Sequence, residues 1–302
     1  YTGSVGKTMP AVLVQGVKAH VLNCFHGVSS LGVLSSFFMK TELAPEFAEK
    51  STAEICPPQT WFCLRDRKEG YDVSVPFRAG GYMSMLGFEK TPDEVIKRLK
   101  ALGRESFEEY ARGMEEKWKA VNCSPFKCPG AAAAAEAEVL TVSELLAYCR
   151  KEQGEAFTTW FSETYKAQKA RLDKGETNFP SATLDFMELL LNQSKISGPV
   201  MLLGFAPPFY PAVDSGEEGK LLFEEMKKAA EKEGVSLKCH EYFCGISDLS
   251  YCGGMDKEEL ARPSVSSLFK NQGIYNALLG VFLLYGIYFS QNLEIVTLFV
   301  FF

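Results

Sequence analysis

The chain has 302 residues, of which 46% are hydrophobic and 23% charged, the makeup of a folded globular protein rather than a disordered or fibrous one. Its net charge of -6, with basic residues interleaved among acids, argues against a nucleic-acid partner. Nine scattered cysteines, an odd number, favour reduced thiols over a disulfide framework. We therefore expect a cytoplasmic protein that binds no nucleic acid.

The first residues contain the letters GSVGKT, which at first sight suggest a phosphate-binding loop. A Walker A loop needs a glycine five positions before its Gly-Lys pair, and that position is Tyr1 here. The run that follows, residues 11–17, is apolar and β-branched and predicts a strand where the motif requires a helix. We therefore interpret the segment as a glycine-rich turn that leads into a strand.

Further elements follow in chain order up to residue 88. An apolar run over 31–39 predicts a helix with Ser29 or Ser30 as its N-cap. Two strands are predicted, one within 59–66 and one within 71–88, where Val73, Val75 and Phe77 alternate with polar residues. The sequence between these strands, residues 67–70, is typical of a hairpin connection.

The next predicted helix begins at Thr91, where Pro92 and two acids occupy the first turn, and runs to about residue 118. The biased segment 122–138 predicts a loop insertion. A capping box at Thr141 and Glu144 begins another helix, and Ser181 is predicted to cap one that reaches residue 191.

A strand-helix-strand unit is predicted from the nearly all-apolar strand 200–205, a helix over 217–233 ended by Gly234, and a strand over 235–243. A strand so apolar is typical of a parallel strand that is covered on both faces. The fold class is therefore predicted as α/β, with residues 9–142 forming a separate α+β module.

Few residues are available for catalysis, because the chain contains three histidines only. It has neither a G-x-S-x-G nucleophile motif nor an H-E-x-x-H zinc helix. His240 and three cysteines, Cys239, Cys244 and Cys252, are donors of the type that zinc prefers, but their spacing fits no paired pattern. Adjacent residues on a strand also point to opposite faces, so we predict buried thiols and no metal site here.

Three separated stretches carry a resemblance: GKTMPAVLVQGVKAHVLNCFHG, PPQTWFCLRDRKEGYDVSVPFRA and YFCGISDLSY. Together they resemble the RocB-like branch of the zinc aminoacylase/carboxypeptidase family, which serves arginine utilisation or amino-acid degradation, over about residues 1–254. The resemblance implies a zinc-binding α/β catalytic domain interrupted by a lid that forms the dimer interface. It divides the chain into a connection (1–8), the lid (9–142), the C-terminal part of the catalytic domain (143–254) and a divergent tail (255–302).

The same resemblance supplies the candidate site residues. His20 matches a lid histidine that reaches the partner subunit's active site, and an imidazole there is placed to stabilise a developing oxyanion. Gly245, Ser247 and Asp248 match a glycine-rich substrate-pocket loop. The alternatives stay open at this stage: an exposed strand-end histidine, a turn that caps its own backbone and, for Arg78, a solvated hairpin charge.

The family's zinc ligands and general base have no counterpart in this chain, so the resemblance implies zinc in a longer parent and none here. We therefore expect a fragment that is inactive alone, from a homodimeric hydrolase of small peptides or N-acyl amino acids. The alternative is a non-catalytic dimerisation or interaction module with a docking tail.

The tail is unusually apolar, and residues 274–289 form an uncharged run of 16 residues, slightly short for a spanning helix. It lacks a flanking basic cluster. We interpret the tail as translation outside the true reading frame and expect no membrane contact, although the apolar stretch 274–302 leaves a membrane anchor or a buried helix open.

Overall fold

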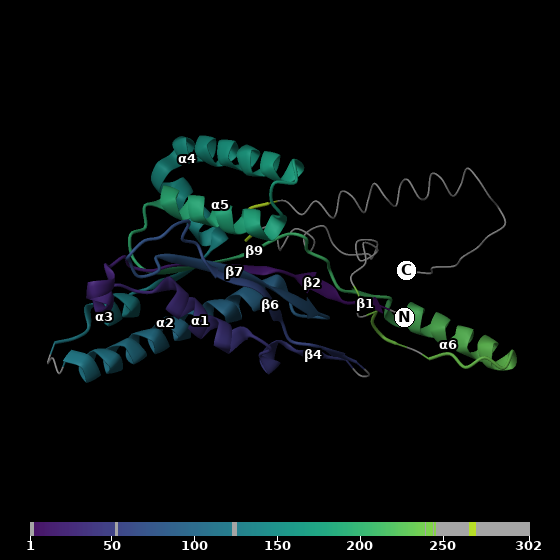
Figure 1. Cartoon of the computed structure of the whole chain (residues 1–302). Coiled ribbons are helices and arrows are strands. Elements are labelled where there is room, and N and C mark those ends of the chain that lie inside the picture. The colour runs from purple at the N-terminus through teal and green to yellow at the C-terminus, as the bar shows by residue number, and fades with distance from the viewer. Residues whose placement is uncertain are drawn as a thin grey trace.

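The computed structural model describes residues 3–51, 54–122, 126–238, 240–243, 245 and 266–269. A mixed α/β architecture is confirmed, with a central sheet between two helical layers (Figure 1). The strands are β1 (Gly3–Ser4), β2 (Gly6–Thr8), β3 (Pro10–Gln15), β4 (Glu49–Lys50), β5 (Ile55–Cys56), β6 (Thr60–Asp66), β7 (Arg78–Gly87), β8 (Glu138–Thr141), β9 (Val200–Phe205) and β10 (Val213–Asp214). The helices are α1 (Ser30–Thr41), α2 (Pro92–Asn122), α3 (Pro129–Ala135), α4 (Val142–Asp173), α5 (Phe179–Ser194) and α6 (Gly216–Lys232), with short 3-10 turns η1 (Val21–His26) and η2 (Pro45–Phe47).

The main sheet has the order β2-β7-β3-β9-β8, and β6 pairs with the other edge of β7. Strands β2 and β3 follow one another along the same edge of β7. Strand β9 is antiparallel to β3 and parallel to β8. The predicted division between 142 and 143 therefore cuts through one continuous sheet, because β9 is hydrogen-bonded to β3 along its whole length.

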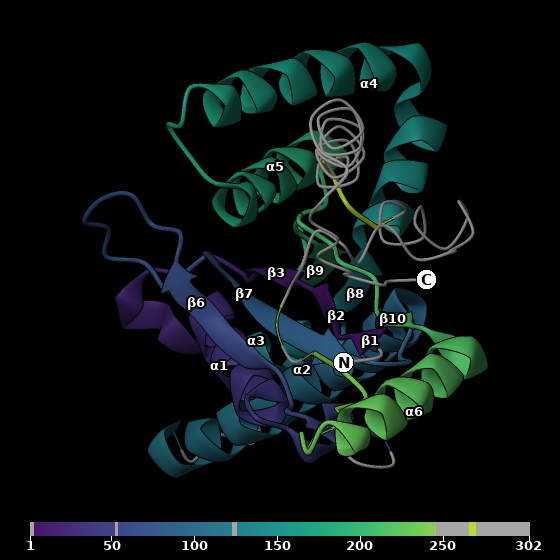
Figure 2. The ribbon, with the colours of Figure 1, turned by 90° about the vertical axis from the view of Figure 1, so that its right-hand side faces the viewer.

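Both faces of the sheet are buried. Val12 and Val14 of β3 pack into the core shared with α1 and α2, whereas Ala11 and Leu13 pack into the core shared with α4 and α5. Because successive side chains of a strand point to opposite faces, alternate residues of β3 pack into two different cores. Figure 2 shows the α4–α5 pair on one side of the sheet and α1 with α2 on the other. This explains why β3 and β9 are apolar at nearly every position.

Several predicted helix signals are confirmed. Ser29 caps α1 by accepting a hydrogen bond from the Gly32 N–H at 3.2 Å. Thr141 and Glu144 form the predicted capping box of α4. Gly234, which follows α6, has a φ of 73°, a conformation that glycine adopts without strain.

Three local predictions are wrong. Asn178, not Ser181, caps α5, because its side chain accepts from the Ser181 N–H at 2.9 Å. The segment 122–138 contains α3 rather than a loop throughout. The glycine-rich start forms the short strands β1 and β2 rather than a turn, which leaves no helix N-terminus for a phosphate.

Two predicted strands also differ. The alternating residues 73–77 form no strand of the sheet, since Val75 donates instead to the Ala19 carbonyl and Pro76 has no N–H to donate. Residues 235–238 are irregular, and Phe243 forms only an isolated bridge. None of the helices in the described ranges combines the length and apolarity needed to cross a bilayer, and the run 274–289 lies outside those ranges.

Candidate functional site

His20 stands beyond the end of β3, where it begins the 3-10 turn η1. Its Nδ1 accepts a hydrogen bond from the Leu22 N–H at 3.2 Å, and its side chain is exposed to solvent. The ring is therefore held by local backbone geometry and is not packed into the core. Its predicted role at a partner's active site stays a prediction.

The hydrogen bond to Nδ1 also determines the tautomer of His20. An atom that accepts from a backbone N–H carries no proton, so the neutral imidazole of His20 has its proton on Nε2. Within the described ranges, no side chain or backbone group forms a hydrogen bond with this Nε2. The ring can thus donate to an oxygen of a ligand or of another molecule.

Apolar side chains surround His20 on the surface. We define the His20 tip as residues 19–26 and 71–75, which are joined by hydrogen bonds from Val21 N–H to Val73 C=O and from Val75 N–H to Ala19 C=O, each 2.9 Å long. Leu22 is 85% exposed and Tyr71 is 96% exposed. An exposed apolar patch of this kind is typical of a contact surface.

Gly245 lies at the opposite end of the sheet from His20. Its carbonyl accepts from the hydroxyl of Ser4, which precedes β2. Strands β2 and β3 together pair with β7 from Gly87 to Arg78, a run of ten residues that spans about 30 Å. The fold therefore does not bring His20 and Gly245 of one chain together, and the predicted residues Ser247 and Asp248 lie outside the described ranges.

Arg78 is not the solvated charge that was the alternative reading of the sequence. Its side chain is 11% exposed, and its guanidinium donates to Gln15 at 2.7 and 3.2 Å and to Glu188 at 3.3 Å. Gln15 is itself buried on β3 and donates to the carbonyls of Ile196 and Gly198. Arg78 thus links the sheet to α5 and to the segment that follows it.

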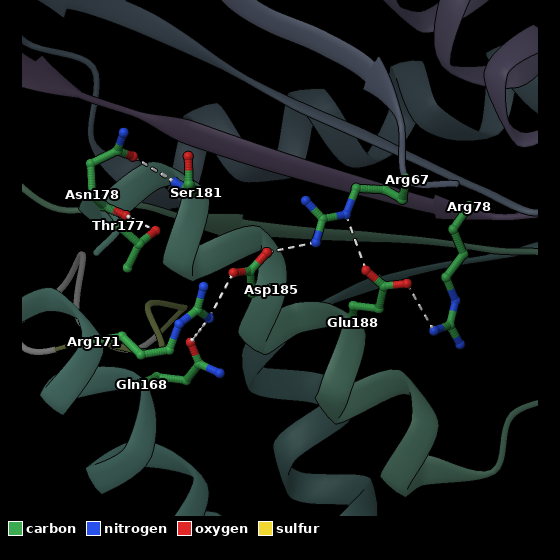
Figure 3. A network of polar contacts seen from close by, with 9 residues as sticks. All are labelled: Arg67, Arg78, Gln168, Arg171, Thr177, Asn178, Ser181, Asp185 and Glu188. Atoms are coloured by element: carbon green, nitrogen blue, oxygen red, sulfur yellow. Dashed lines mark hydrogen bonds and ion pairs between the residues drawn. The ribbon is translucent and has the colours of Figure 1, made fainter. Parts of the chain in front are cut away.

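The network around Arg78 continues across the sheet–helix interface (Figure 3). Arg67 donates to Asp185 at 2.6 Å and to Glu188 at 3.0 Å, and Arg171 of α4 donates to Asp185 at 2.9 Å. Every charged group in it has an opposite partner, which identifies a structural clamp rather than a ligand site. The signal in the sequence was the pair of acids three residues apart, which are the only charged residues of α5.

The described ranges contain no group of three or more His, Cys, Asp or Glu side chains placed to hold a metal ion. His240, one of the potential zinc donors, directs its Nδ1 to Glu54 at 2.9 Å. Cys239, Cys244 and Cys252 lie outside those ranges. The described residues therefore do not form a zinc site, and the zinc that the resemblance implies for a longer parent stays a prediction.

Comparison with known proteins gives distant relatives. The chain is 29% identical to the uncharacterized protein YqjN of Bacillus subtilis (strain 168) over 295 residues, which is 93% of this chain and 52% of YqjN. It is 23% identical to the protein RocB of the same organism over 262 residues, 83% of this chain and 44% of RocB. The chain thus spans about half the length of these curated relatives. The aminopeptidase PepT of Bacillus cereus ATCC 10987 is similar with a TM-score of 0.41 and 12% identity, over 82% of this chain and 41% of PepT.

Residues 250–302 match the model of a separate family, described as a protein of unknown function (DUF1304). Translation outside a reading frame produces a sequence that resembles no natural family. The match therefore contradicts our interpretation of the tail as translation outside the true reading frame, because residues 250–302 are similar to a known family.

Proposed function

We propose that this chain is the lid and an adjoining part of a metal-dependent hydrolase that cleaves an amide or peptide bond next to a free carboxylate. The substrates would be N-acyl amino acids or small peptides, consumed in amino-acid catabolism such as that of arginine. Supporting this are the three motifs and the similarity to RocB. The observation that carries it is the exposed Nε2–H of His20, which lies at the opposite end of the sheet from Gly245.

Under this proposal one site would be built from two chains. His20 of one protomer would act at the pocket of its partner, where its Nε2–H donates to the substrate carboxylate or to the oxyanion that develops at the scissile carbonyl. The apolar His20 tip would be buried in the same contact. Because the described residues do not fit a zinc ion, none of them is assigned a role toward a metal, and any zinc would be held by residues outside the described ranges.

The isolated chain tests this proposal. We expect light scattering to give twice the chain mass of 33.5 kDa, and we expect no hydrolysis of N-acetyl amino acids or dipeptides with added zinc. Turnover by this chain, at a rate unchanged in His20→Asn, would refute the proposal, and so would a monomer at micromolar concentration.

A second function, a non-catalytic interaction module, is favoured by the same exposed tip. NMR of the histidine ring separates the two. A carboxylate-binding His20 should shift its ring resonances on addition of N-acetylarginine, and His20→Asn should abolish that change. If the protein is a dimer and the His20 ring resonances do not shift on addition of any N-acyl amino acid, the result would instead support the interaction module.

A further inference from the structure

A cavity of about 250 Å³ lies at the end of the sheet remote from His20. It is formed where β2 and the segment 209–212 meet the turn between β7 and α2. Two glycines let its walls pack closely: a Cβ on Gly6 would come within 2.7 Å of the Ala212 nitrogen, and one on Gly87 within 2.7 Å of Glu49 Oε1. Neither glycine has room for a side chain.

Lys7 is one of four charged residues that line this cavity, together with Glu49, Glu89 and Lys90. Its backbone is fixed on both sides, because Lys7 exchanges two hydrogen bonds with Tyr210 and pairs with Leu86 of β7. Its ammonium makes no ion pair or hydrogen bond within the described ranges, and burial lowers the pKa of Lys7. A half-buried cation without a counter-charge is destabilising, and an anion placed beside it would relieve that cost.

The acids of the cavity restrict the charge of such an anion. Glu49 accepts the backbone N–H groups of Phe88, Glu89 and Lys90 at 2.6, 2.7 and 3.2 Å, so those donors are already occupied. Glu49 and Glu89 both line the cavity and would repel a multiply charged ion such as phosphate. A carboxylate with a single negative charge suits one free ammonium better.

The other residues that line the cavity restrict the polarity and the size of the rest of the ligand. Leu86, Phe88, Val95 and Phe209 contribute apolar surface. The volume lies below the range of drug-sized pockets. A molecule with one ring and a short chain fits these limits.

We propose that this cavity binds a small monocarboxylate with an apolar body, and that Lys7 holds the carboxylate. The site is independent of His20 and of the hydrolysis proposed above. Because its wall includes both β2 and the segment 209–212, a bound ligand would brace these two segments against the β7–α2 turn.

Calorimetric titration of the purified chain with 3-phenylpropionate tests the site. We expect one molecule bound per chain, with the neutral 3-phenylpropanamide and inorganic phosphate each binding at least about tenfold more weakly. Equal binding of the amide would show that Lys7 contributes nothing. Tighter binding of phosphate, or no binding of 3-phenylpropionate at millimolar concentration, would also overturn the proposal.

Substitutions assign the binding to Lys7. Lys7→Met should weaken 3-phenylpropionate at least about tenfold, whereas Lys7→Arg should largely retain binding. The matched control is Lys97→Met, which removes an exposed lysine of α2 and should leave affinity unchanged. Circular dichroism should show all three variants folded, and unchanged affinity in folded Lys7→Met would refute the site.

Discussion

Arg67 Nη2 lies 2.6 Å from Asp185 Oδ1 across the interface between the sheet and α5. The Arg67 side chain is 11% exposed, and burial alone would lower its pKa, but the hydrogen bonds and charges of Asp185 and Glu188 raise it. The guanidinium therefore stays charged inside the protein. This pair fixes α5, and with it α4, on one face of the sheet.

Asp185→Ala should destabilise the fold by about 3 kcal/mol, because it leaves Arg67 and Arg171 without one of their counter-charges in a partly buried site. Urea denaturation measures the change. The control is Asp173→Ala, which removes an exposed pair with Lys169 and should cost less than about 0.5 kcal/mol. Equal losses in the two variants would contradict a clamp.

Glu49 is the second buried acid whose removal should be costly. Its side chain is 9% exposed and accepts three backbone N–H groups ahead of α2, so Glu49→Ala should cost about 2 kcal/mol of unfolding free energy. Thermal and urea denaturation would report the loss. Glu89→Ala, at an exposed neighbouring position, should be nearly neutral.

Glu144 makes stability depend on pH. Burial alone would raise its pKa, but hydrogen bonds from Lys100 and from the Thr141 N–H lower it below the ordinary value. A carboxylate whose pKa is lower in the folded state than in the unfolded state stabilises the folded protein at pH values above the unfolded-state pKa of about 4.3. This stabilisation is lost as the pH falls through the folded-state pKa. The melting temperature of the wild type should therefore be higher than that of Glu144→Gln at pH 7. This difference in melting temperature should disappear below about pH 4. A difference in melting temperature that persisted at pH 2 would show that Glu144 is not the source of the pH dependence.

His20→Asn separates the structural from the functional contribution of the ring. Asparagine is a good N-cap, so its side chain should still accept from the Leu22 N–H, and the melting temperature should change little. Binding of N-acetyl amino acids at the partner's pocket should nevertheless be lost. A large fall in melting temperature would show that His20 serves the fold of the tip instead.

The elements with local signals were predictable from the sequence. Thr141 and Glu144 carry a complete capping box, and the acids after Pro92 mark the start of α2. The partner of β9 could not be predicted, because an apolar strand has no local feature that selects its neighbour. For the same reason Arg78 was not recognised as buried, since its acid partner lies 110 residues away on α5.

The candidate site was predicted in part. The sequence places His20 at the end of an alternating strand, whereas β3 ends five residues earlier at Gln15 and His20 begins the turn η1. The placement of His20 and Gly245 at opposite ends of the sheet was not foreseen, because it depends on β2 and β3 lying in line along β7. Sequence periodicity describes one strand at a time and contains no information on such alignment.

The pairing of β3 with β9 also constrains how the protein is made. Val12 faces Leu203, so about 190 residues must leave the ribosome after β3 before its second edge is covered, which takes about 10 to 40 seconds at usual synthesis rates. Until then a strand that is apolar at every position except Gln15 keeps one row of backbone groups open to other chains. Nascent chains should therefore depend on chaperones that shield strand edges, and slow translation downstream of β3 should increase misfolding in the cell.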